Sequence, residues 1–201
     1  MIGFAKKIGM TSLFIEGRAV PVTAVKVAES FVLQKKTTTK EGYVAVQIGA
    51  FRKKKGAKAA LGHSQKYLNT PQAFGKIGEF KNIEINEKTK FDVRDFNEGD
   101  TLSITAFSTG LGFSGGVKRW GFRGQPASHG HDHKRAVGSI GAGGVQRVFP
   151  GTKMAGRKGK DKFTLNGQKI VAVDYANALL FVKGSLPGNN KGILKIAKTT
   201  H

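Results

Sequence analysis

The segment "KFTLNGQKIVAVDYANALLFVKG" at residues 162–184 is the clearest indication of the fold. Apolar and polar residues alternate along its short runs, and turn-forming residues stand at Asn166-Gly167 and around Asn177. Alternation bounded by such residues is typical of antiparallel strands joined by tight turns. The segment "GILKIA" at 192–197 continues the pattern. We therefore expect the last part of the chain to consist of strands.

The first half of the chain repeats this alternation in short pieces. Turn signals stand at Glu16-Gly17, at Glu41-Gly42 and at 97–100, where Gly, Asn and Asp favour a change of chain direction. Strand-forming sequence thus lies on both sides of the middle of the chain. The alternating pieces, each of which predicts one strand, are "AVPVTAVKV" at 19–27, "YVAVQIGAF" at 43–51, "NIEIN" at 82–86 and "TLSITAF" at 101–107.

The expected fold class is mainly β, with a small antiparallel barrel, because many short strands favour closure and closure leaves no unpaired edge. Residues 1–109 are expected to form the first part of the barrel, and residues 161–201 to complete it. Residues 52–80 lack strand alternation and contain Ala, Lys and Leu, so we predict a basic, partly helical insertion there. Residues 110–160 are predicted to form a long irregular internal extension.

The net charge of the chain points to a polyanionic partner. Its 201 residues include 34 Lys and Arg against 13 Asp and Glu, a formal net charge of +21 at pH 7. A charge this large repels itself in a compact monomer. No basic amphipathic helix, long apolar segment or signal peptide is visible, so we expect a soluble, intracellular protein with no membrane partner. The absence of cysteine excludes disulfides and thiolate metal sites.

Residues 110–160 have the composition of an RNA-binding arm. They hold 14 of the 28 glycines and ten Lys or Arg, with Asp132 as the single acid. Phe113, Trp120, Phe122 and Phe149 are large apolar residues that a plain flexible linker would not carry. Glycine lets the backbone approach a crowded surface, and Lys and Arg neutralise phosphates. We expect this arm to thread between the phosphates of a folded RNA and to become ordered on binding.

A histidine cluster in the arm has a second interpretation. His129, His131 and His133 are similar to the H-x-H-x-D-H signature of metallo-hydrolases, because alternate residues of an extended chain face one side. The order here is H-G-H-D-H, so one spacer is missing before Asp132, and further downstream ligands are lacking. The same imidazoles can instead stack on bases or hydrogen-bond to phosphate and ribose. A third interpretation is that they are exposed loop residues without a role.

Two glycine motifs are incomplete. "GLGFSG" at 110–115 matches the dinucleotide fingerprint, but the glycine-rich residues that follow cannot form the helix it requires. "GTKMAGRKG" at 151–159 lacks the Lys-Ser/Thr pair of a phosphate-binding loop. No paired carboxylates and no nucleophile with a nearby base are visible. We therefore expect no enzymatic activity, no catalytic residue, no bound metal or cofactor, and no small-molecule substrate.

The chain resembles the bacterial type of the large-subunit ribosomal protein three family over nearly its whole length. The arm is the most specific part of the match, and only residues 52–80 match loosely. The matching motifs are "KKIGMT" at 6–11, "AVQIG" at 45–49, "GGVKRWGFRGQPASHG" at 115–130, "GSIG" at 138–141, "RVFPGTKMAGRKG" at 147–159 and "LLFVKGSLPG" at 179–188.

The resemblance implies a translation-factor-type barrel and an extension that reaches toward the peptidyl transferase centre, where it stabilises ribosomal RNA without performing the chemistry. It also implies a role in early assembly of the large subunit, neighbouring large-subunit proteins as partners beside the RNA, and a location in cytoplasmic or organellar ribosomes. The tip is expected near residues 139–145. The family does not generally carry histidines at the spacing of His131 and His133. The residues expected to bind RNA are Lys118, Arg119, Trp120, Arg123, His129, His131, His133, Lys134, Arg135, Arg147, Lys153, Arg157 and Lys158.

Two other functions stay open beside a structural role in the ribosome. The histidine cluster at 129–133 would suit a metal-dependent hydrolase, and the basic arm would suit a non-ribosomal RNA chaperone that binds nucleic acid with little preference.

Overall fold

The computed structural model describes residues 1–81 and 89–199. These residues divide into two compact units, of which the first contains residues 1–81, 89–106 and 162–199 and the second is Phe107–Asp161. The strand predicted at 82–86 lies outside the described residues. In the part of the chain that the structure describes, no helix is long and apolar enough to cross a bilayer.

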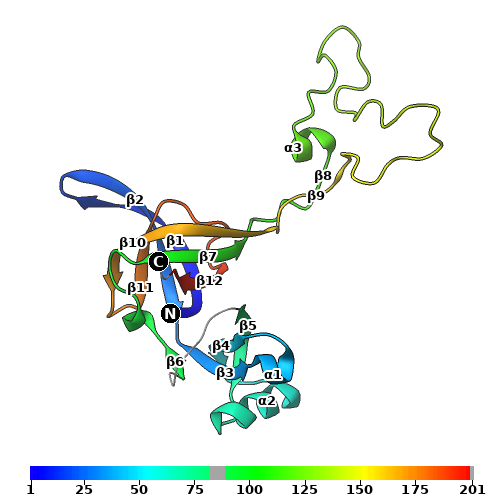
Figure 1. The fold of residues 1–201 in the computed structure, drawn as a ribbon. Helices are drawn as coiled ribbons and strands as arrows, with labels where there is room; N and C mark the ends of the chain where they lie inside the picture. Colours follow the sequence, from blue (N-terminus) through cyan, green and yellow to red (C-terminus); the bar gives the residue numbers. More distant parts are fainter. Residues whose placement is uncertain (82–88, 200–201) are drawn as a thin grey trace. The chain divides into compact units, whose positions relative to one another are not determined.

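Six strands of the first unit close into a barrel (Figure 1). Their order around the barrel is β1-β12-β7-β10-β11-β2. The first and last parts of the chain therefore complete one another, and the expected mainly β fold with little helix is confirmed. The strands are β1 (Ile2–Ile15), β2 (Arg18–Ala28), β7 (Thr101–Phe107), β10 (Lys162–Asp174), β11 (Leu179–Lys183) and β12 (Ile193–Lys198).

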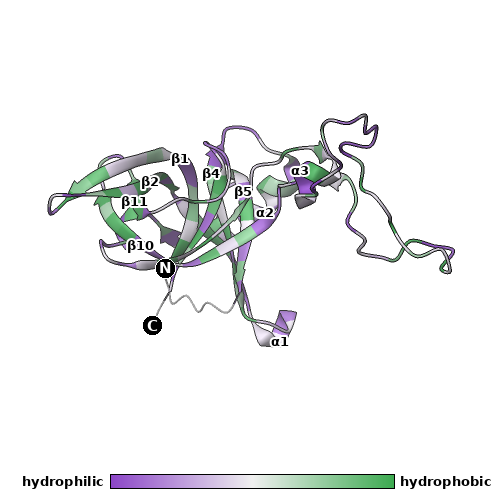
Figure 2. Cartoon of the chain, turned by 90° about the horizontal axis from the view of Figure 1, so that it is seen from above, coloured by the Kyte–Doolittle hydropathy of each residue, from purple (hydrophilic) through white to green (hydrophobic). Residues whose placement is uncertain are grey.

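The barrel interior is filled by the apolar residues of the alternating segments. On β7, Leu102, Ile104 and Ala106 are buried while the residues between them are partly exposed. Leu180 and Val182 on β11 face the same interior. Figure 2 shows the corresponding alternation of hydrophobic and hydrophilic residues along the barrel strands. Burial of such side chains removes apolar surface from water and is the main stabilisation of this unit.

The turn predicted at Asn166-Gly167 is wrong, because β10 continues through these residues. Gly167 has a φ of +75°, a conformation that glycine adopts without strain, so the strand passes this point without reversing. The Asn166 side chain accepts a hydrogen bond from Ser103 Oγ of β7 at 2.7 Å. The turn around Asn177 is confirmed, and the Asp174 carboxylate accepts hydrogen bonds from backbone N–H groups within it.

The first strand, β1, was missed because charged and glycine residues interrupt its alternation. Lys7 is only 9% exposed, since its ammonium donates to the carbonyl oxygens of Leu186 at 2.6 Å and Gly188 at 3.1 Å. The hairpin from β1 to β2 turns at Glu16-Gly17, as predicted, with φ of +49° and +76°. Positive φ at both positions is the geometry that matches the twist of a two-residue hairpin.

A second sheet, outside the barrel, has the strand order β5-β4-β3-β6. Its core joins Val46, Ile48 and Phe80 to Ile2 and Phe4 of β1. The strand expected at 43–51 thus belongs to this sheet, although residues 1–109 were expected to form barrel strands and the insertion. Neighbouring strands in the sequence pair locally, which favours a separate sheet because short connections close easily. Its elements are β3 (Ser30–Lys36), α1 (Thr38–Glu41), β4 (Ala45–Lys53), α2 (Lys58–Leu68), β5 (Ala73–Lys81) and β6 (Lys90–Phe91), followed by the 3-10 turn η1 (Val93–Asp95).

The predicted insertion at 52–80 is partly helical, as expected, because α2 lies within it. Its last residues form β5, which pairs with β4. The second unit, Phe107–Asp161, is mostly irregular. It contains two short paired strands, β8 (Phe113–Ser114) and β9 (Gly156–Arg157), and the short helix α3 (Gly116–Trp120). From here on we call residues 107–161 the extension.

Candidate RNA interface

The two limbs of the extension are joined at their base by backbone hydrogen bonds. Leu111 N donates to Lys158 O at 2.9 Å, and Lys158 N donates to Gly112 O at 2.9 Å. Just beyond, Phe113 pairs with Arg157. The outgoing and returning limbs therefore form a narrow ribbon, which brings cations from both limbs close together.

Beyond this ribbon, α3 packs against the returning limb through the carbonyl oxygen of Met154. Arg119 Nη1 and Trp120 Nε1 each donate to this oxygen at 2.8 Å. The Arg119 guanidinium also lies 4.8 Å from the centre of the Trp120 ring, and Lys153 Nζ lies 5.7 Å from it. Cations at these distances are attracted to the face of an aromatic ring. The structure thus brings three predicted RNA-binding residues together, two of them at the Met154 carbonyl and Lys153 at the Trp120 ring.

Two glycines allow this close packing. A Cβ atom at Gly156 would come within 2.5 Å of Arg119 Nη1, so a side chain here would displace the guanidinium from its place beside the returning limb. A Cβ at Gly116 would come within 2.8 Å of the Phe122 ring. The helix then ends at Gly121, whose φ of +74° is the left-handed conformation common after a helix.

The structure divides the predicted RNA-binding residues into two groups. The first group lies at the base of the extension, where the Lys158 ammonium also donates to Lys118 O; it contains Lys118, Arg119, Trp120, Lys153, Arg157 and Lys158. The second group is exposed in segments without helix or strand and contains Arg123, His129, His131, His133, Lys134, Arg135 and Arg147.

The three clustered histidines do not share one side of an extended chain. His129 has a φ of +64° and Gly130 a φ of +73°, so the chain turns between the first and second histidine. Among residues 1–81 and 89–199, no three His, Cys, Asp or Glu side chains gather as metal ligands. The geometry on which a hydrolase site would depend is therefore not formed by His129, His131, His133 and Asp132.

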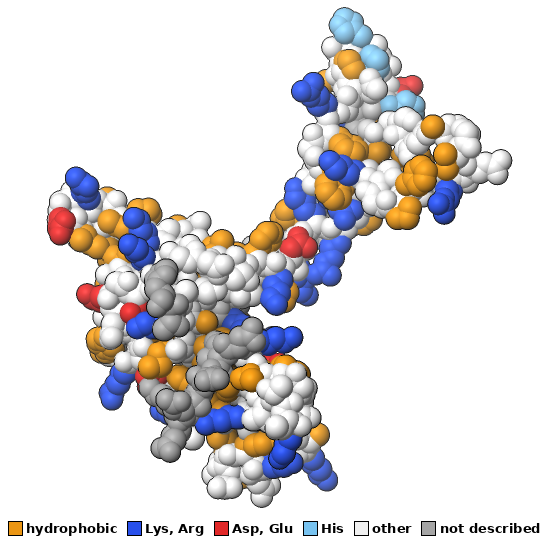
Figure 3. Space-filling model, in the orientation of Figure 1, with side chains coloured by type: hydrophobic (Ala, Val, Ile, Leu, Met, Phe, Trp, Pro, Cys, Tyr) orange, Lys and Arg blue, Asp and Glu red, His pale blue; other side chains and the backbone are white. Residues whose placement is uncertain are grey.

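The cations of the extension are electrostatically unbalanced. No Lys or Arg at positions 107–161 forms an ion pair with a carboxylate among the described residues. Figure 3 shows its Lys, Arg and His side chains on the surface. Phosphate groups are the natural partners of such unpaired cations, and one released counterion accompanies each contact.

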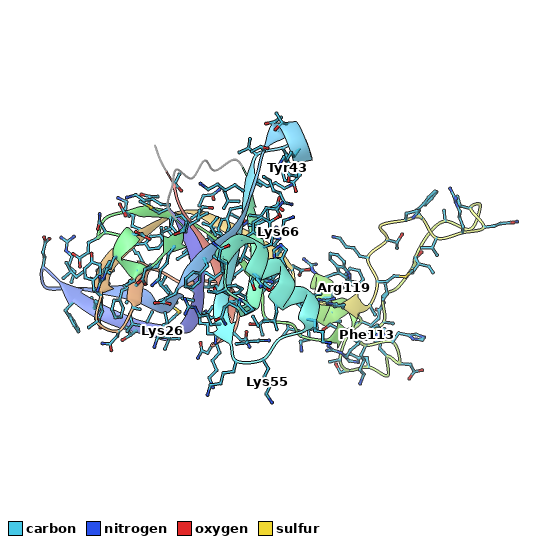
Figure 4. The ribbon with its side chains drawn as sticks, turned by 90° about the horizontal axis from the view of Figure 1, so that it is seen from below. Lys26, Tyr43, Lys55, Lys66, Phe113 and Arg119 are labelled. Carbon is cyan, nitrogen blue, oxygen red and sulfur yellow. The ribbon has the colours of Figure 1, made fainter. Side chains whose placement is uncertain are left out.

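One exposed aromatic residue of the extension was not among the predicted site residues. The Phe113 side chain is 81% exposed and lies on β8, opposite Arg157 (Figure 4). An exposed aromatic ring is a surface on which an unpaired base can stack. The sequence marks Phe113 as one of the large apolar residues of the arm, but its residue type alone did not assign it to RNA binding.

The comparisons with known proteins agree on one family. A family model described as Ribosomal protein L3 matches residues 34–178. The large ribosomal subunit protein uL3c of Cyanophora paradoxa is 44% identical over 200 residues, which cover 96% of this chain and 94% of that protein. The uL3 proteins of Thermosipho melanesiensis and Chloroherpeton thalassium are 41% and 44% identical, over 95% of this chain and 94% and 95% of their own lengths.

The match extends through the part of the chain that carries the candidate interface. The family model includes the whole extension and β4, β5 and β7 on its N-terminal side. The alignments with the relatives cover almost the full chain, 96% and 95% of its length. This chain therefore belongs to the ribosomal protein L3 family.

Proposed function

We propose that the chain is a structural component of the large ribosomal subunit that binds ribosomal RNA through its extension and performs no enzymatic chemistry. The observation that carries the proposal is a glycine-rich extension, within an L3-family chain, whose ten cations at 110–160 have no carboxylate partners among the described residues. Association with the RNA and proteins of the large subunit follows from the same family membership.

The two groups of site residues are assigned different tasks. Residues at the base, such as Arg119 and Trp120, keep the limbs together and present cations along the ribbon. The exposed loop residues, including Arg123 and the three histidines, contact phosphates and unpaired bases farther along the extension. The tip near 139–145 reaches toward the peptidyl transferase centre and stabilises the RNA there during and after early assembly.

The test is co-sedimentation of the tagged chain with large subunits in increasing salt. A ribosomal component remains in the particle in moderately high salt, because many phosphate contacts and packed neighbours hold it. A non-ribosomal RNA chaperone would dissociate gradually and would bind other RNAs equally well. Recovery of the chain only in the free fraction would contradict the proposal.

A further inference from the structure

A cavity of about 450 Å³ lies beside the second sheet, in the first unit. It has the size of a small-molecule site, for which roughly 300–1,000 Å³ is usual. The lining residues come from β3, β4, β5, the end of α2 and the segment that follows α2: Phe31, Arg52, Leu68, Thr70, Gln72 and Phe74. We call it the Phe31 pocket. None of its residues belongs to the extension.

The walls of the Phe31 pocket are flat. The rings of Phe31 and Phe74 are 5.9 Å apart between centroids and tilted by 37°. The Arg52 guanidinium lies 4.2 Å from the centre of the Phe31 ring. Both rings are half-buried and Arg52 is exposed. Aromatic rings and a guanidinium plane are the surfaces on which unpaired RNA bases stack.

Arg52 reaches this pocket because of an unusual backbone conformation at Phe51. Phe51 has a φ of +58°, which is strained for a bulky residue. Ala50 is buried in the core of the second sheet, and Phe51 packs against the same core. Two consecutive residues thus face the core, and the alternation of the strand shifts by one. As a result Arg52 lies with Phe31 and with Phe74, its partner across the strands.

The position of Phe74 depends on a glycine. A Cβ atom at Gly49 would come within 2.7 Å of the Phe74 ring. Gly49 is also the residue that pairs with Phe31 on the neighbouring strand. A side chain at this position would therefore push one wall of the pocket out of place. The positive φ of Phe51 and the glycine at 49 together allow Arg52, Phe31 and Phe74 to lie side by side.

The charge around the pocket favours RNA over an apolar protein segment. Lys53, Lys54 and Lys55 follow Arg52 directly, and all three are exposed. Lys66 lies on α2, and Figure 4 shows Lys55 and Lys66 projecting near this helix. These cations can bind the phosphates on either side of a base held in the pocket. Thr70 and Gln72 add a hydroxyl and an amide that can hydrogen-bond to the edge of the base.

We propose that the Phe31 pocket binds one unpaired base of ribosomal RNA, stacked against Phe31, Phe74 and Arg52. The inference rests on the proposed function, because it takes RNA as the partner. The proposed contact lies on the second sheet and is separate in sequence from the extension. It recognises a base, whereas contacts to the phosphate backbone carry no sequence information.

The deciding experiment is photo-crosslinking in isolated large subunits. The full chain carries p-benzoyl-phenylalanine in place of Phe31, or in place of Phe14 as the control, since Phe14 is 80% exposed and outside the pocket. The proposal predicts an RNA adduct from position 31 that maps to one unpaired nucleotide. A protein adduct or no adduct at position 31 overturns it. Absence of both chains from large subunits would instead contradict the proposed function itself.

An experiment in solution distinguishes the contribution of base stacking to RNA affinity from the contribution of charge. Fluorescence anisotropy measures binding of the full chain to a single-stranded A10 oligonucleotide and to an abasic strand with the same number of phosphates. Phe31→Leu keeps an apolar side chain but removes the ring, so affinity for A10 should fall about tenfold while affinity for the abasic strand stays unchanged. Phe31→Tyr should restore binding, and Phe14→Leu should change neither value.

Arg52→Lys completes the series, because it keeps the positive charge but loses the planar group. We expect Arg52→Lys to lower the affinity for A10 but not for the abasic strand. The loss should be smaller than that caused by Phe31→Leu. The proposal is overturned if Phe31→Leu and Phe14→Leu bind A10 alike, with unchanged thermal unfolding of both. If the unmodified chain binds neither strand, the proposed RNA-binding function fails instead.

Discussion

The first unit and the extension differ in what holds them together. The buried hydrophobic side chains of the described residues all lie in the first unit, in the barrel and the second sheet. The extension buries only Ser114 and Gly116 and exposes large side chains such as Phe113 and Phe149. The first unit can therefore fold by hydrophobic burial, whereas the extension lacks a core to offset its chain entropy.

The two regions also differ in the balance of charge. In the first unit Lys36 pairs with Glu79 at 2.7 Å, and the hydrogen bonds that Lys36 donates to Glu79 and Tyr43 raise the pKa of Lys36. Lys198 likewise pairs with Asp100 at 2.7 Å. The cations of the extension have no such partners among the described residues. The comparison suggests one region that folds by itself and one whose shape depends on phosphates.

The largest effect is expected from removing the extension. Deletion of residues 115–158 should leave a folded barrel and second sheet, because no buried apolar side chain is lost. It should abolish stable incorporation into large subunits, because most cations of the extension are removed. Sedimentation of the tagged variant measures incorporation, and thermal unfolding with circular dichroism checks the fold. Normal incorporation of a folded deletion variant would contradict the role given to the extension.

The second prediction compares the loss of stability when one apolar side chain is truncated in each region. Ile104→Ala removes a fully buried barrel side chain and should lower the free energy of unfolding by about 2–5 kcal/mol. Phe149→Ala removes a side chain that is 55% exposed in the extension and should change it by less than about 0.5 kcal/mol. Urea unfolding of the free chain measures both. Equal destabilisation by the two changes would show that the extension has a core of its own.

A third prediction concerns the ion pair between Lys198 and Asp100 in the first unit and the pH dependence of its contribution to stability. Burial by itself would raise the pKa of Asp100, but hydrogen bonds from Lys198 and from the backbone N–H of Asn97 outweigh it and hold the pKa below its usual value. A lowered folded-state pKa means that the stabilisation is present above the unfolded pKa, about 3.9, and is lost as pH falls through the folded value.

Asp100→Asn should therefore reduce the free energy of unfolding at pH 7 by about 1–2 kcal/mol. The difference from the unmodified chain should shrink below about pH 4 and vanish once Asp100 is protonated in the folded state. Urea unfolding at several pH values tests this. A difference that persists at low pH would show that the charge of Asp100 is not what stabilises the folded chain.

The smallest effect is expected for a single exposed cation of the extension. Arg123→Ala should lower the slope of log affinity against log salt, for binding to ribosomal RNA, by roughly 0.7–0.9. Arg18→Ala is the matched control, because Arg18 is exposed in the first unit at the start of β2. Anisotropy titrations between low and moderate salt provide both slopes. An unchanged slope for Arg123→Ala would mean that this side chain contacts no phosphate.

The fold was predictable where one face of a strand is buried. The strands predicted at 19–27 and 101–107 correspond to β2 and β7, because their alternation matches their burial. The alternation of apolar and polar residues could not show which strands belong to the barrel and which to the second sheet, because strands of both bury one face. It also missed β1, where the buried Lys7 finds backbone carbonyl partners from residues far along the chain.

The candidate site was predictable in composition but not in geometry. The cations and glycines of the extension are evident in the sequence, and their roles in RNA binding stay predictions. The arrangement of Arg119 and Trp120 around Met154 O could not be predicted from the sequence. Every residue has a backbone carbonyl, so residue types do not show which carbonyl accepts these hydrogen bonds. The Phe31 pocket was missed for a related reason, since residues from three strands meet only after Phe51 adopts a positive φ.

Hydrogen–deuterium exchange of the extension tests the difference between the two regions most directly. The exchange of backbone amides is compared between the free full-length chain and the same chain in isolated large subunits. We predict that barrel amides such as those of β7 are protected in both states. Amides of residues 115–155 should exchange rapidly in the free chain and become protected in the subunit. Strong protection of these amides in the free chain at physiological ionic strength would contradict the dependence of the extension on RNA.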